Sequence, residues 1–379
     1  MRALGIDCGQ LEHRFCLLGE GGQVLAEGAF AESRRGLEAL RRQVEAQGEP
    51  ALVVMEASGS CWQNLQAEVA SWGWPAQAVD PQQAAQFARL LHPRHKTDKA
   101  DARSLARLGL QAPRSSFASG PEATLAHGLA RGIGQRAVLM NQLHGLLVIA
   151  NPALILCRWA LDAPRTLAVL RRYPTTRELR RARALAQVSF GQRARVGEEA
   201  AQALREAAQE ALCGALNEAH AAQIRFLVEQ IATWSEEIAR LREALRARLP
   251  QAQRLTSIPG VGEQTALLVT ACVPFDRLAS AKQAAAYVGL HPHLVQSGQS
   301  CYSRLSRRGN SIARTALYRA ALPASRHNPR LAAFYQRLVA RGKTHKQALC
   351  AVAHKLVRIC FALMKFQTSY SPTYQPERT

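Results

Sequence analysis

The chain has 379 residues and a net charge of +21, with 49 Lys and Arg against 28 Asp and Glu. This length supports two or three domains, each with a core of its own. The sequence contains no run of about 18 uncharged apolar residues, so no membrane span is predicted. The N-terminus does not resemble a secretion signal. The nine cysteines contain no Cys-x-x-Cys pair, which argues against a disulfide framework or a structural zinc site. We therefore expect a cytoplasmic protein without a membrane partner.

The positive charge is unevenly distributed along the chain. Residues 1–115 carry 13 basic and 13 acidic side chains, so the other 36 basic and 15 acidic side chains account for the whole net charge. From Arg277 to the end there are 17 basic residues and a single acid, Glu377. A general preference for arginine would not leave the first third of the chain neutral. The asymmetry favours a polyanionic partner, and nucleic acid first among these.

The first 110 residues alternate between short apolar runs and amphipathic segments. The expected strands lie at residues 3–7, 14–18, 23–30, 51–56 and 76–79. The expected helices lie at residues 33–46, 61–72, 81–91 and 97–110. Three antiparallel strands followed by two helix-connected strands are typical of an RNase H-like (RuvC-like) α/β domain, which we assign to residues 1–115.

Four acidic residues stand where this domain could bring them together. Asp7 and Glu56 each end an apolar strand, and Asp98 and Asp101 lie three residues apart at a predicted helix start. Carboxylates so close would repel one another unless cations neutralised them. Their hard oxygen atoms suit Mg²⁺ or Mn²⁺. Two such ions would form the usual clamp for cutting and transferring phosphodiesters.

Residues 122–250 are expected to form a helical arm. Apolar residues from Ile224 to Leu245 follow gaps of three and four, a heptad seam typical of a coiled coil. A second apolar series from Leu125 to Leu146 predicts a partner helix, which would pair within the chain or with a second chain. Between the two helices, residues 177–195 are strongly basic and are expected to be partly irregular.

A mainly α-helical domain is expected over residues 251–379. Its first segment, from Ile258 to Gly262, reads Ile-Pro-Gly-Val-Gly and precedes a helix, as in a helix-hairpin-helix motif. There Gly260 and Gly262 would allow a tight turn, and N–H groups at the helix start could contact phosphate. A purely structural turn would have a similar sequence.

A serine with several basic neighbours follows in the same domain. Ser297 precedes Gly298, and Arg304, Arg307 and Arg308 come soon after it. Serine is a nucleophile only when a base or metal ion activates it, and most serines beside glycine are simply turn residues. Arginine binds phosphate well through its planar fork. The basic segment, continued by Asn310 and Arg314, is a candidate nucleic-acid contact.

At this point the chain resembles the DEDD-class insertion-sequence transposases, the group that includes Piv-type DNA invertases and bridge-RNA-guided recombinases. In the first domain the resemblance rests on Gly-Ile-Asp at residues 5–7, Met-Glu-Ala-Ser-Gly at 55–59 and Lys-Thr-Asp-Lys-Ala-Asp-Ala at 96–102. In the last it rests on residues 258–262, 287–292, 297–298 and 304–310. Cys8 and Cys61 stand where the family has a valine-like and an aromatic residue.

The resemblance implies specific roles for the candidate residues. The family's metal-binding acids map to Asp7, Glu56, Asp98 and Asp101, and its catalytic serine maps to Ser297. That serine would attack the scissile phosphate and hold the cut end as a phosphoserine. The resemblance also implies target and donor DNA as substrates and a guide RNA. Because Ser297 lies in another domain than the acids, we expect a composite site, and the heptad arm predicts a homo-oligomer, either a dimer or a tetramer.

Three alternatives remain open at this stage. A hydrolytic, junction-resolving nuclease on the same core would use water, with Ser297 as a turn residue. Residues 6–9, Ile-Asp-Cys-Gly, also resemble a phosphate loop of sugar-kinase and actin-type ATPases, but the second Asp-Gly motif of those proteins is missing. A non-catalytic nucleic-acid-binding protein would bind without metal and would not cut.

Overall fold

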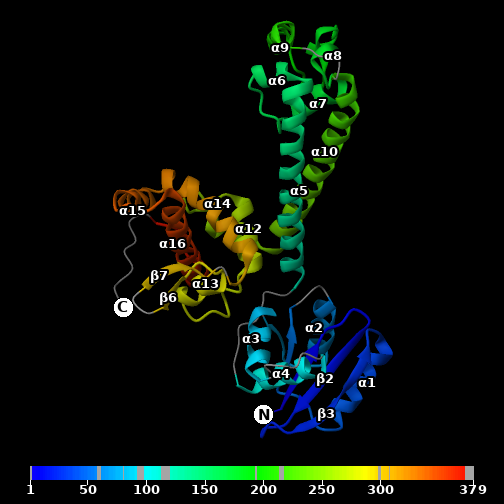
Figure 1. Ribbon diagram of the computed structural model, residues 1–379, viewed down its shortest axis with the longest axis vertical. Coiled ribbons are helices and arrows are strands. Elements are labelled where there is room, and N and C mark those ends of the chain that lie inside the picture. Colours follow the sequence, from blue (N-terminus) through cyan, green and yellow to red (C-terminus); the bar gives the residue numbers. More distant parts are fainter. Residues whose placement is uncertain are drawn as a thin grey trace. The chain divides into compact units, whose positions relative to one another are not determined.

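The computed structural model describes most of the chain (Figure 1). The described residues are 2–57, 61–79, 81–91, 98–111, 120–192, 194–212, 217–297, 300–306 and 308–371. They form two compact units. One unit contains Met1–Thr124 and Leu249–Thr379, and the other contains Leu125–Arg248.

A mixed five-stranded sheet organises the N-terminal part of the chain. The strands are β1 (Ala3–Asp7), β2 (Glu12–Leu18), β3 (Val24–Ala31), β4 (Leu52–Glu56) and β5 (Ala76–Val79). Their order in the sheet is β3-β2-β1-β4-β5. The β1, β2 and β3 strands pair antiparallel, whereas β4 is parallel to both β1 and β5. This meander followed by parallel strands fits an RNase H-like fold, as the order of elements in the sequence predicts.

Helices cover both faces of this sheet. They are α1 (Arg34–Glu45), α2 (Cys61–Ser71), α3 (Pro81–Leu91) and α4 (Asp98–Gln111). Because side chains alternate along a strand, Leu4 and Ile6 point to one face and pack with residues of α1 and α2. On the other face, residues of β2 and β4 pack against α3 and α4. Trp62, Trp72 and Trp74 belong to the α1–α2 side of the core.

Two long helices dominate the second unit, α5 (Pro121–Ala150) and α10 (Asn217–Arg248). They run antiparallel to each other, because Gly128 faces Leu241 and Gly132 faces Trp234 and Ile238. The Arg136 side chain donates to Ser235 Oγ at 2.9 Å and fixes the register further. The predicted pairing of these helices within one chain is therefore present (Figure 1).

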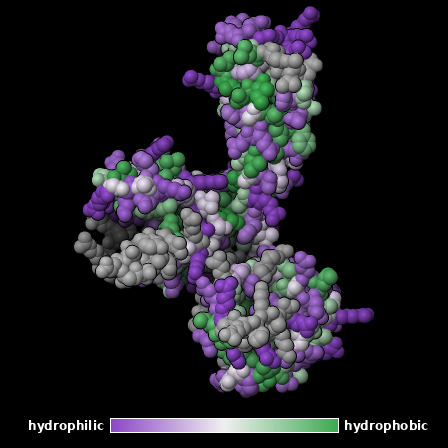
Figure 2. All heavy atoms as spheres, in the orientation of Figure 1, coloured by the Kyte–Doolittle hydropathy of each residue, from purple (hydrophilic) through white to green (hydrophobic). Residues whose placement is uncertain are grey.

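Short helices between α5 and α10 build a local core. They are α6 (Pro152–Leu156), α7 (Pro164–Arg172), α8 (Thr176–Arg180), the 3-10 helix η1 (Leu185–Gln187) and α9 (Glu198–Glu210). Leu143 and Leu147 of α5 and Ile224 and Ile231 of α10 pack with their buried side chains. Figure 2 shows apolar side chains also reaching the surface near these short helices. The basic segment 177–195 is a mixture of helix, turn and a single bridge, as expected.

The C-terminal part is mainly helical, with one β-hairpin. Its elements are η2 (Pro250–Ala252), α11 (Gln253–Thr256), α12 (Glu263–Cys272), α13 (Ala281–Tyr287), β6 (Pro292–Ser297), β7 (Ser300–Leu305), α14 (Ser311–His327), α15 (Pro329–Ala340) and α16 (His345–Phe366). The α14 and α16 helices contribute buried apolar stripes, including Leu317 and Ala321 on the first and Leu356 and Val357 on the second. None of the described helices has the length and apolar character needed to cross a membrane.

Candidate active site

The α4 helix lies unusually close to the β1 strand at Gly5. A Cβ atom on Gly5 would lie 2.2 Å from the carbonyl oxygen of Ala102 and 2.3 Å from the backbone nitrogen of Ala106. No larger residue fits there unless the helix shifts, so the glycine allows backbone-to-backbone packing. This contact sets the position of α4 on the sheet.

The direction of α4 places its N-terminal end beside the C-terminal ends of β1 and β4. Further along the helix, a Cβ on Gly109 would lie 3.1 Å from Ala3 and 3.9 Å from Leu52, which start β1 and β4. The helix therefore runs antiparallel to β1. Asp101 directly precedes Ala102, and Asp98 is the first residue of α4. Both positions thus lie toward the end of the sheet at which β1 and β4 finish.

Asp7 and Glu56 are the last residues of β1 and β4, so both lie at this end of the sheet, which we call the acidic edge. The β1 and β4 strands are parallel neighbours with Ile6 paired to Met55, so the two acids that follow occupy adjacent positions. Both carboxylates act on the nearby Cys8 thiol. Burial raises the pKa of the Cys8 thiol to about 12. Smaller contributions come from the negative charges of Asp7, Cys61, Glu32 and Glu56, in decreasing order. The fold thus brings Asp7 and Glu56 together and directs the start of α4, with Asp98 and Asp101, to the same edge.

Residues that the sequence alone did not single out surround these acids. His13, at the start of β2, is fully buried and bonded through Nε2 to the Glu32 carboxylate. The His13 ring also packs on Phe30, with centroids 4.8 Å apart. The signal in the sequence was weak, because His13 lies between the charged residues Glu12 and Arg14 and so reads as part of an exposed polar stretch. Together with Cys8 and Cys61, this pair forms the surroundings of the acidic edge.

The donor atoms at this edge are of the type that a hard divalent cation prefers. Asp7, Glu56 and Asp101 offer carboxylate oxygens, and Mg²⁺ in proteins binds carboxylates and water rather than thiols. The side chain of Asp98 lies outside the part of the chain that the structure describes. Among the side chains that are described, no group of three or more His, Cys, Asp or Glu residues is arranged to hold a metal ion. The donor atoms are therefore of the kind that Mg²⁺ binds, while their arrangement around an ion, with Asp98 as the fourth ligand, stays a prediction.

Ser297 lies in a separate element, the hairpin of β6 and β7. It is the last residue of β6 and pairs with Ser300, so it stands at the closed end of the hairpin. Gly298, Gln299 and Arg307 lie outside the described residues. Arg304 belongs to β7, in register with His293, and Arg308 follows the hairpin as an exposed residue. The candidate serine and its basic neighbours therefore share one hairpin and the segment that follows it.

Asn310 and Arg314 have contacts inside the protein. Asn310 is buried and caps α14 by accepting from the Ala313 N–H at 2.9 Å, while its amide nitrogen donates to Cys272 O at 3.4 Å. Arg314 donates from Nη1 to Val288 O at 3.0 Å. These bonds tie the start of α14 to α12 and α13. The predicted contact of both residues with nucleic acid stays a prediction.

The glycine-rich turn before α12 has a structural role as well as a candidate binding role. Gly260 has a φ of +94°, and a Cβ there would lie 2.3 Å from the backbone nitrogen of Ala324. Gly262 is the N-cap of α12 and provides no side-chain cap. The helix before the turn, α11, has only four residues and is preceded by the 3-10 turn η2. The first helix of the predicted helix-hairpin-helix motif is therefore short.

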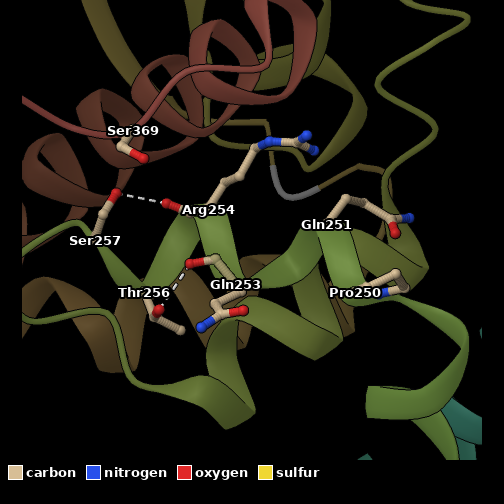
Figure 3. A pocket seen from close by; sticks show the side chains of 7 residues that line it. All are labelled: Pro250, Gln251, Gln253, Arg254, Thr256, Ser257 and Ser369. Carbon is tan, nitrogen blue, oxygen red and sulfur yellow. Dashed lines mark hydrogen bonds between the residues drawn. The ribbon is translucent and has the colours of Figure 1, made fainter.

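A polar cavity of about 680 Å³ opens beside this turn (Figure 3). Its lining consists of Pro250, Gln251, Gln253, Arg254, Thr256, Ser257 and Ser369. Ser257 Oγ donates to Arg254 O at 2.6 Å and accepts from the Tyr370 N–H at 2.9 Å. The segment after α16 is thus attached to α11, and hydroxyl, amide and guanidinium groups face the opening.

Two family models match this chain. The model for a DEDD-type IS110 transposase, described as "Transposase", matches residues 4–152. The model described as "Transposase IS116/IS110/IS902 family" matches residues 252–336. The first match contains Asp7, Glu56, Asp98 and Asp101, and the second contains the Gly260 turn, the Ser297 hairpin and α14.

Curated relatives agree with these matches. The chain is 31% identical over 153 residues to the "Insertion element IS110 uncharacterized 43.6 kDa protein" of Streptomyces coelicolor, covering 38% of each protein. It is 31% identical over 148 residues to the "Pilin gene-inverting protein" of Moraxella bovis, covering 36% of this chain and 46% of the relative. It is 32% identical over 148 residues to the "Transposase for insertion sequence element IS1111A" of Coxiella burnetii, covering 38% and 39%.

Each alignment spans less than half of the relative's own length. The family assignment therefore rests on the two domain matches and their order. The names of the relatives are consistent with that assignment. A DEDD family of this kind implies a divalent metal ion, in agreement with the carboxylates at the edge of the sheet. With a DEDD-type N-terminal domain and a C-terminal transposase domain matched in order along one chain, the protein belongs to the DEDD-class insertion-sequence transposases.

Proposed function

We propose that this protein is a DNA recombinase that cuts and rejoins DNA strands during transposition. The observation that carries the proposal is the packing of α4 against β1 at Gly5. Because of this packing, the start of α4, with Asp98 and Asp101, lies toward the acidic edge, where β1 and β4 end at Asp7 and Glu56. The names of the relatives, which include a transposase and a gene-inverting protein, support strand exchange as the overall reaction.

The four acids would hold the divalent cation, Mg²⁺ or Mn²⁺. Bound there, the cation supplies Lewis-acid stabilisation of charge on the reacting phosphate. The chain's own contribution is to fix the carboxylates on two strands and one helix, which are rigid elements. Burial of the sheet beneath them, including Ile6 and Met55, keeps that arrangement in place.

Ser297 is the proposed nucleophile. Its Oγ would form a bond to the scissile phosphorus as the bond to the 3′ oxygen breaks, and its proton would leave with the 3′ hydroxyl. Rejoining would be the reverse reaction with a new 3′ hydroxyl, so the phosphodiester bond count is conserved. Arg304, Arg307 and Arg308 would offset the negative charge that builds up on the phosphate. The hairpin position of Ser297 supports this proposal, because the end of a hairpin can reach a substrate.

Two partners complete the proposal. A guide RNA is proposed from the resemblance, with the strongly basic C-terminal region as its chemical support. A homo-oligomer is proposed because the arm exposes apolar side chains, with Val138 51% and Phe226 63% exposed on its two long helices. Glycines 260 and 262, in the turn before α12, would contact phosphate through backbone N–H groups.

The covalent intermediate is the sharpest test of the chemistry. The full-length protein, Ser297→Ala and Asp7→Asn would each be incubated with Mg²⁺, end-labelled junction DNA of the element and its flanking transcript, then separated on a denaturing gel. We expect a DNA-labelled protein band with the unchanged protein alone. Ser300→Ala is the matched control, since Ser300 pairs with Ser297 in the same hairpin, and it should retain the band.

A hydrolytic nuclease is the second candidate, favoured by one observation. All four acids lie in the N-terminal sheet domain, so a metal-activated water could cut DNA there without the hairpin. In that case Ser297→Ala would cut as well as the unchanged protein, and no labelled protein band would form. Asp7→Asn would be inactive under either mechanism, which separates loss of the acidic site from loss of the serine.

A further inference from the structure

The α15 helix carries a row of cationic side chains along one face. Arg330, Phe334, Arg337 and Arg341 are spaced by four, three and four residues, which places them on the same side of a helix. All three arginines are exposed, whereas Phe334 is half-buried. Eleven residues of helix span about 16 Å, so the row is long enough to follow an extended charged ligand.

The neighbouring helix α16 adds two cations to this row. Lys355 Nζ lies 4.5 Å from the centroid of the Phe334 ring, and Arg337 Cζ lies 5.6 Å from the same centroid. The aromatic ring thus holds one cation from each helix through cation–π contacts. Arg358 lies three residues beyond Lys355 and is exposed like it. We call Arg330, Arg337, Lys355 and Arg358 the α15–α16 basic face.

These cations act on one another across the two helices. Partial burial, followed by the charges of Arg358, Arg337 and Arg330, lowers the pKa of Lys355. In the sequence, no Asp or Glu occurs between Asp276 and Glu377. The surface over these helices is mostly hydrophilic in Figure 2. A compact group of like charges costs free energy in the unbound protein, and a polyanion would offset that cost.

We infer that the α15–α16 basic face binds the phosphate backbone of duplex DNA. The choice of DNA rests on the proposed function, which makes DNA the substrate. Along about 16 Å, one strand of duplex DNA presents about five phosphates, which matches the length of the row on α15. Contacts of this kind fix the position of the protein on the duplex and carry no sequence information. The face lies outside the residues that the sequence motifs singled out as nucleic-acid contacts.

A paired set of variants tests the inference. Arg337→Gln with Lys355→Gln removes two charges but keeps aliphatic stems that can cover Phe334. Arg326→Gln with Lys346→Gln removes two exposed charges of the same domain. Lys346 lies nine residues before Lys355, two and a half turns away on the opposite side of α16. Circular dichroism and the melting temperature of each full-length variant would establish that both are folded.

Binding would be measured by fluorescence anisotropy with a labelled mixed-sequence duplex, in EDTA, at several salt concentrations. Loss of two phosphate contacts should reduce the slope of log K against log salt by about two and weaken binding about 30-fold near 0.15 M salt. The control variant should bind within about threefold of the unchanged protein. Equal affinities for the two double variants would overturn the inference.

Parallel titrations with single-stranded DNA and with a structured RNA identify the ligand. If Arg337→Gln with Lys355→Gln weakens binding of the RNA but leaves duplex binding unchanged, the face is an RNA surface and the inference is wrong. Because EDTA prevents metal-dependent cutting, this result does not depend on the proposed chemistry. If the covalent band is absent but the variant still loses duplex binding, only the proposed serine mechanism fails.

Discussion

Replacing Gly5 with alanine should separate α4 from β1 and disturb the acidic edge. The new Cβ would lie 2.2 Å from Ala102 O, whereas ordinary van der Waals contact begins at 3.4 Å, so the helix must retreat by about 1.2 Å. The obstructing atoms belong to the helix backbone, which cannot move aside as a flexible side chain can. Overpacking of this kind costs about 1–3 kcal/mol of the free energy of unfolding.

A loss of activity should accompany the loss of stability. Asp98 and Asp101 move with α4, while Asp7 and Glu56 stay with the sheet. Mg²⁺ requires ligands at about 2.0–2.1 Å in near-octahedral geometry, and a misplacement of about 1 Å at a reacting centre can cost about 100-fold. We therefore expect Gly5→Ala to cut DNA about 100-fold more slowly in saturating Mg²⁺ while it remains folded.

Urea unfolding followed by tryptophan fluorescence would measure stability in both units, because Trp62, Trp72 and Trp74 lie in this domain and the other tryptophans, Trp159 and Trp234, lie in the second unit. Single-turnover cutting of labelled DNA would measure activity. Gly145→Ala is the matched control: Gly145 lies inside α5, and a Cβ there would have no neighbour within 4 Å. Alanine favours helix over glycine by about 1 kcal/mol, so this variant should be slightly more stable and fully active.

A Gly5→Ala protein with normal stability and normal cutting rate would refute the reasoning. It would mean either that α4 does not lie against β1 at this point or that its acids do not take part in the reaction. Normal stability with lost activity would leave the packing argument wrong and the role of the edge intact. Lost stability with a normal cutting rate of the folded fraction would support the packing argument and contradict the role of the acidic edge.

Three further outcomes follow from local structure. Gly260→Ala should lower the free energy of unfolding by about 1–3 kcal/mol in urea titrations, because its Cβ would meet the Ala324 backbone at 2.3 Å and its φ is +94°; an unchanged midpoint would contradict this. Burial, followed by the charge of Arg358, lowers the pKa of His354 from its ordinary 6.5. The unfolded state therefore binds more protons as the pH falls past 6.5, so stability should decrease as the pH is lowered below 6.5, and less so in His354→Gln. Burial raises the pKa of Cys272 from 9.0 to about 12; mass spectrometry after iodoacetamide treatment at about pH 8.5 should find this thiol unmodified in the folded protein and modified in urea.

Local patterns were sufficient to predict the elements of the N-terminal domain. The continuous apolar runs that contain Ile6 and Val53 predicted buried strands, and apolar residues spaced by three and four predicted the helices. Every strand and helix expected there is present, and no end differs from the expected one by more than two residues. Ser33 accounts for one such difference, because its side chain caps α1 from outside the helix.

The neighbourhood of the acidic edge could not be predicted in the same way. The placement of α4 depends on contacts between residues about one hundred positions apart, such as Gly5 with Ala102 and Ala106. The pairing of His13 with Glu32 depends on the register of the hairpin between β2 and β3. Likewise, nothing in the row of cations on α15 showed that Phe334 would bring Lys355 of another helix beside it. Such features arise from packing between elements, which periodicity within one element does not encode.

The division of charge along the chain has a consequence for how the reaction can be controlled. The acids lie in a segment with equal numbers of basic and acidic residues, whereas the net positive charge lies entirely in the rest of the chain. Carboxylates repel a phosphate, so attraction of DNA must come from the basic region, and neutralisation at the acidic edge must come from a divalent cation. Monovalent salt should therefore weaken DNA binding, while divalent cation should govern the step after binding. Since the two effects act on different groups, DNA binding in EDTA and cutting in Mg²⁺ can be changed independently by substitutions in the two regions.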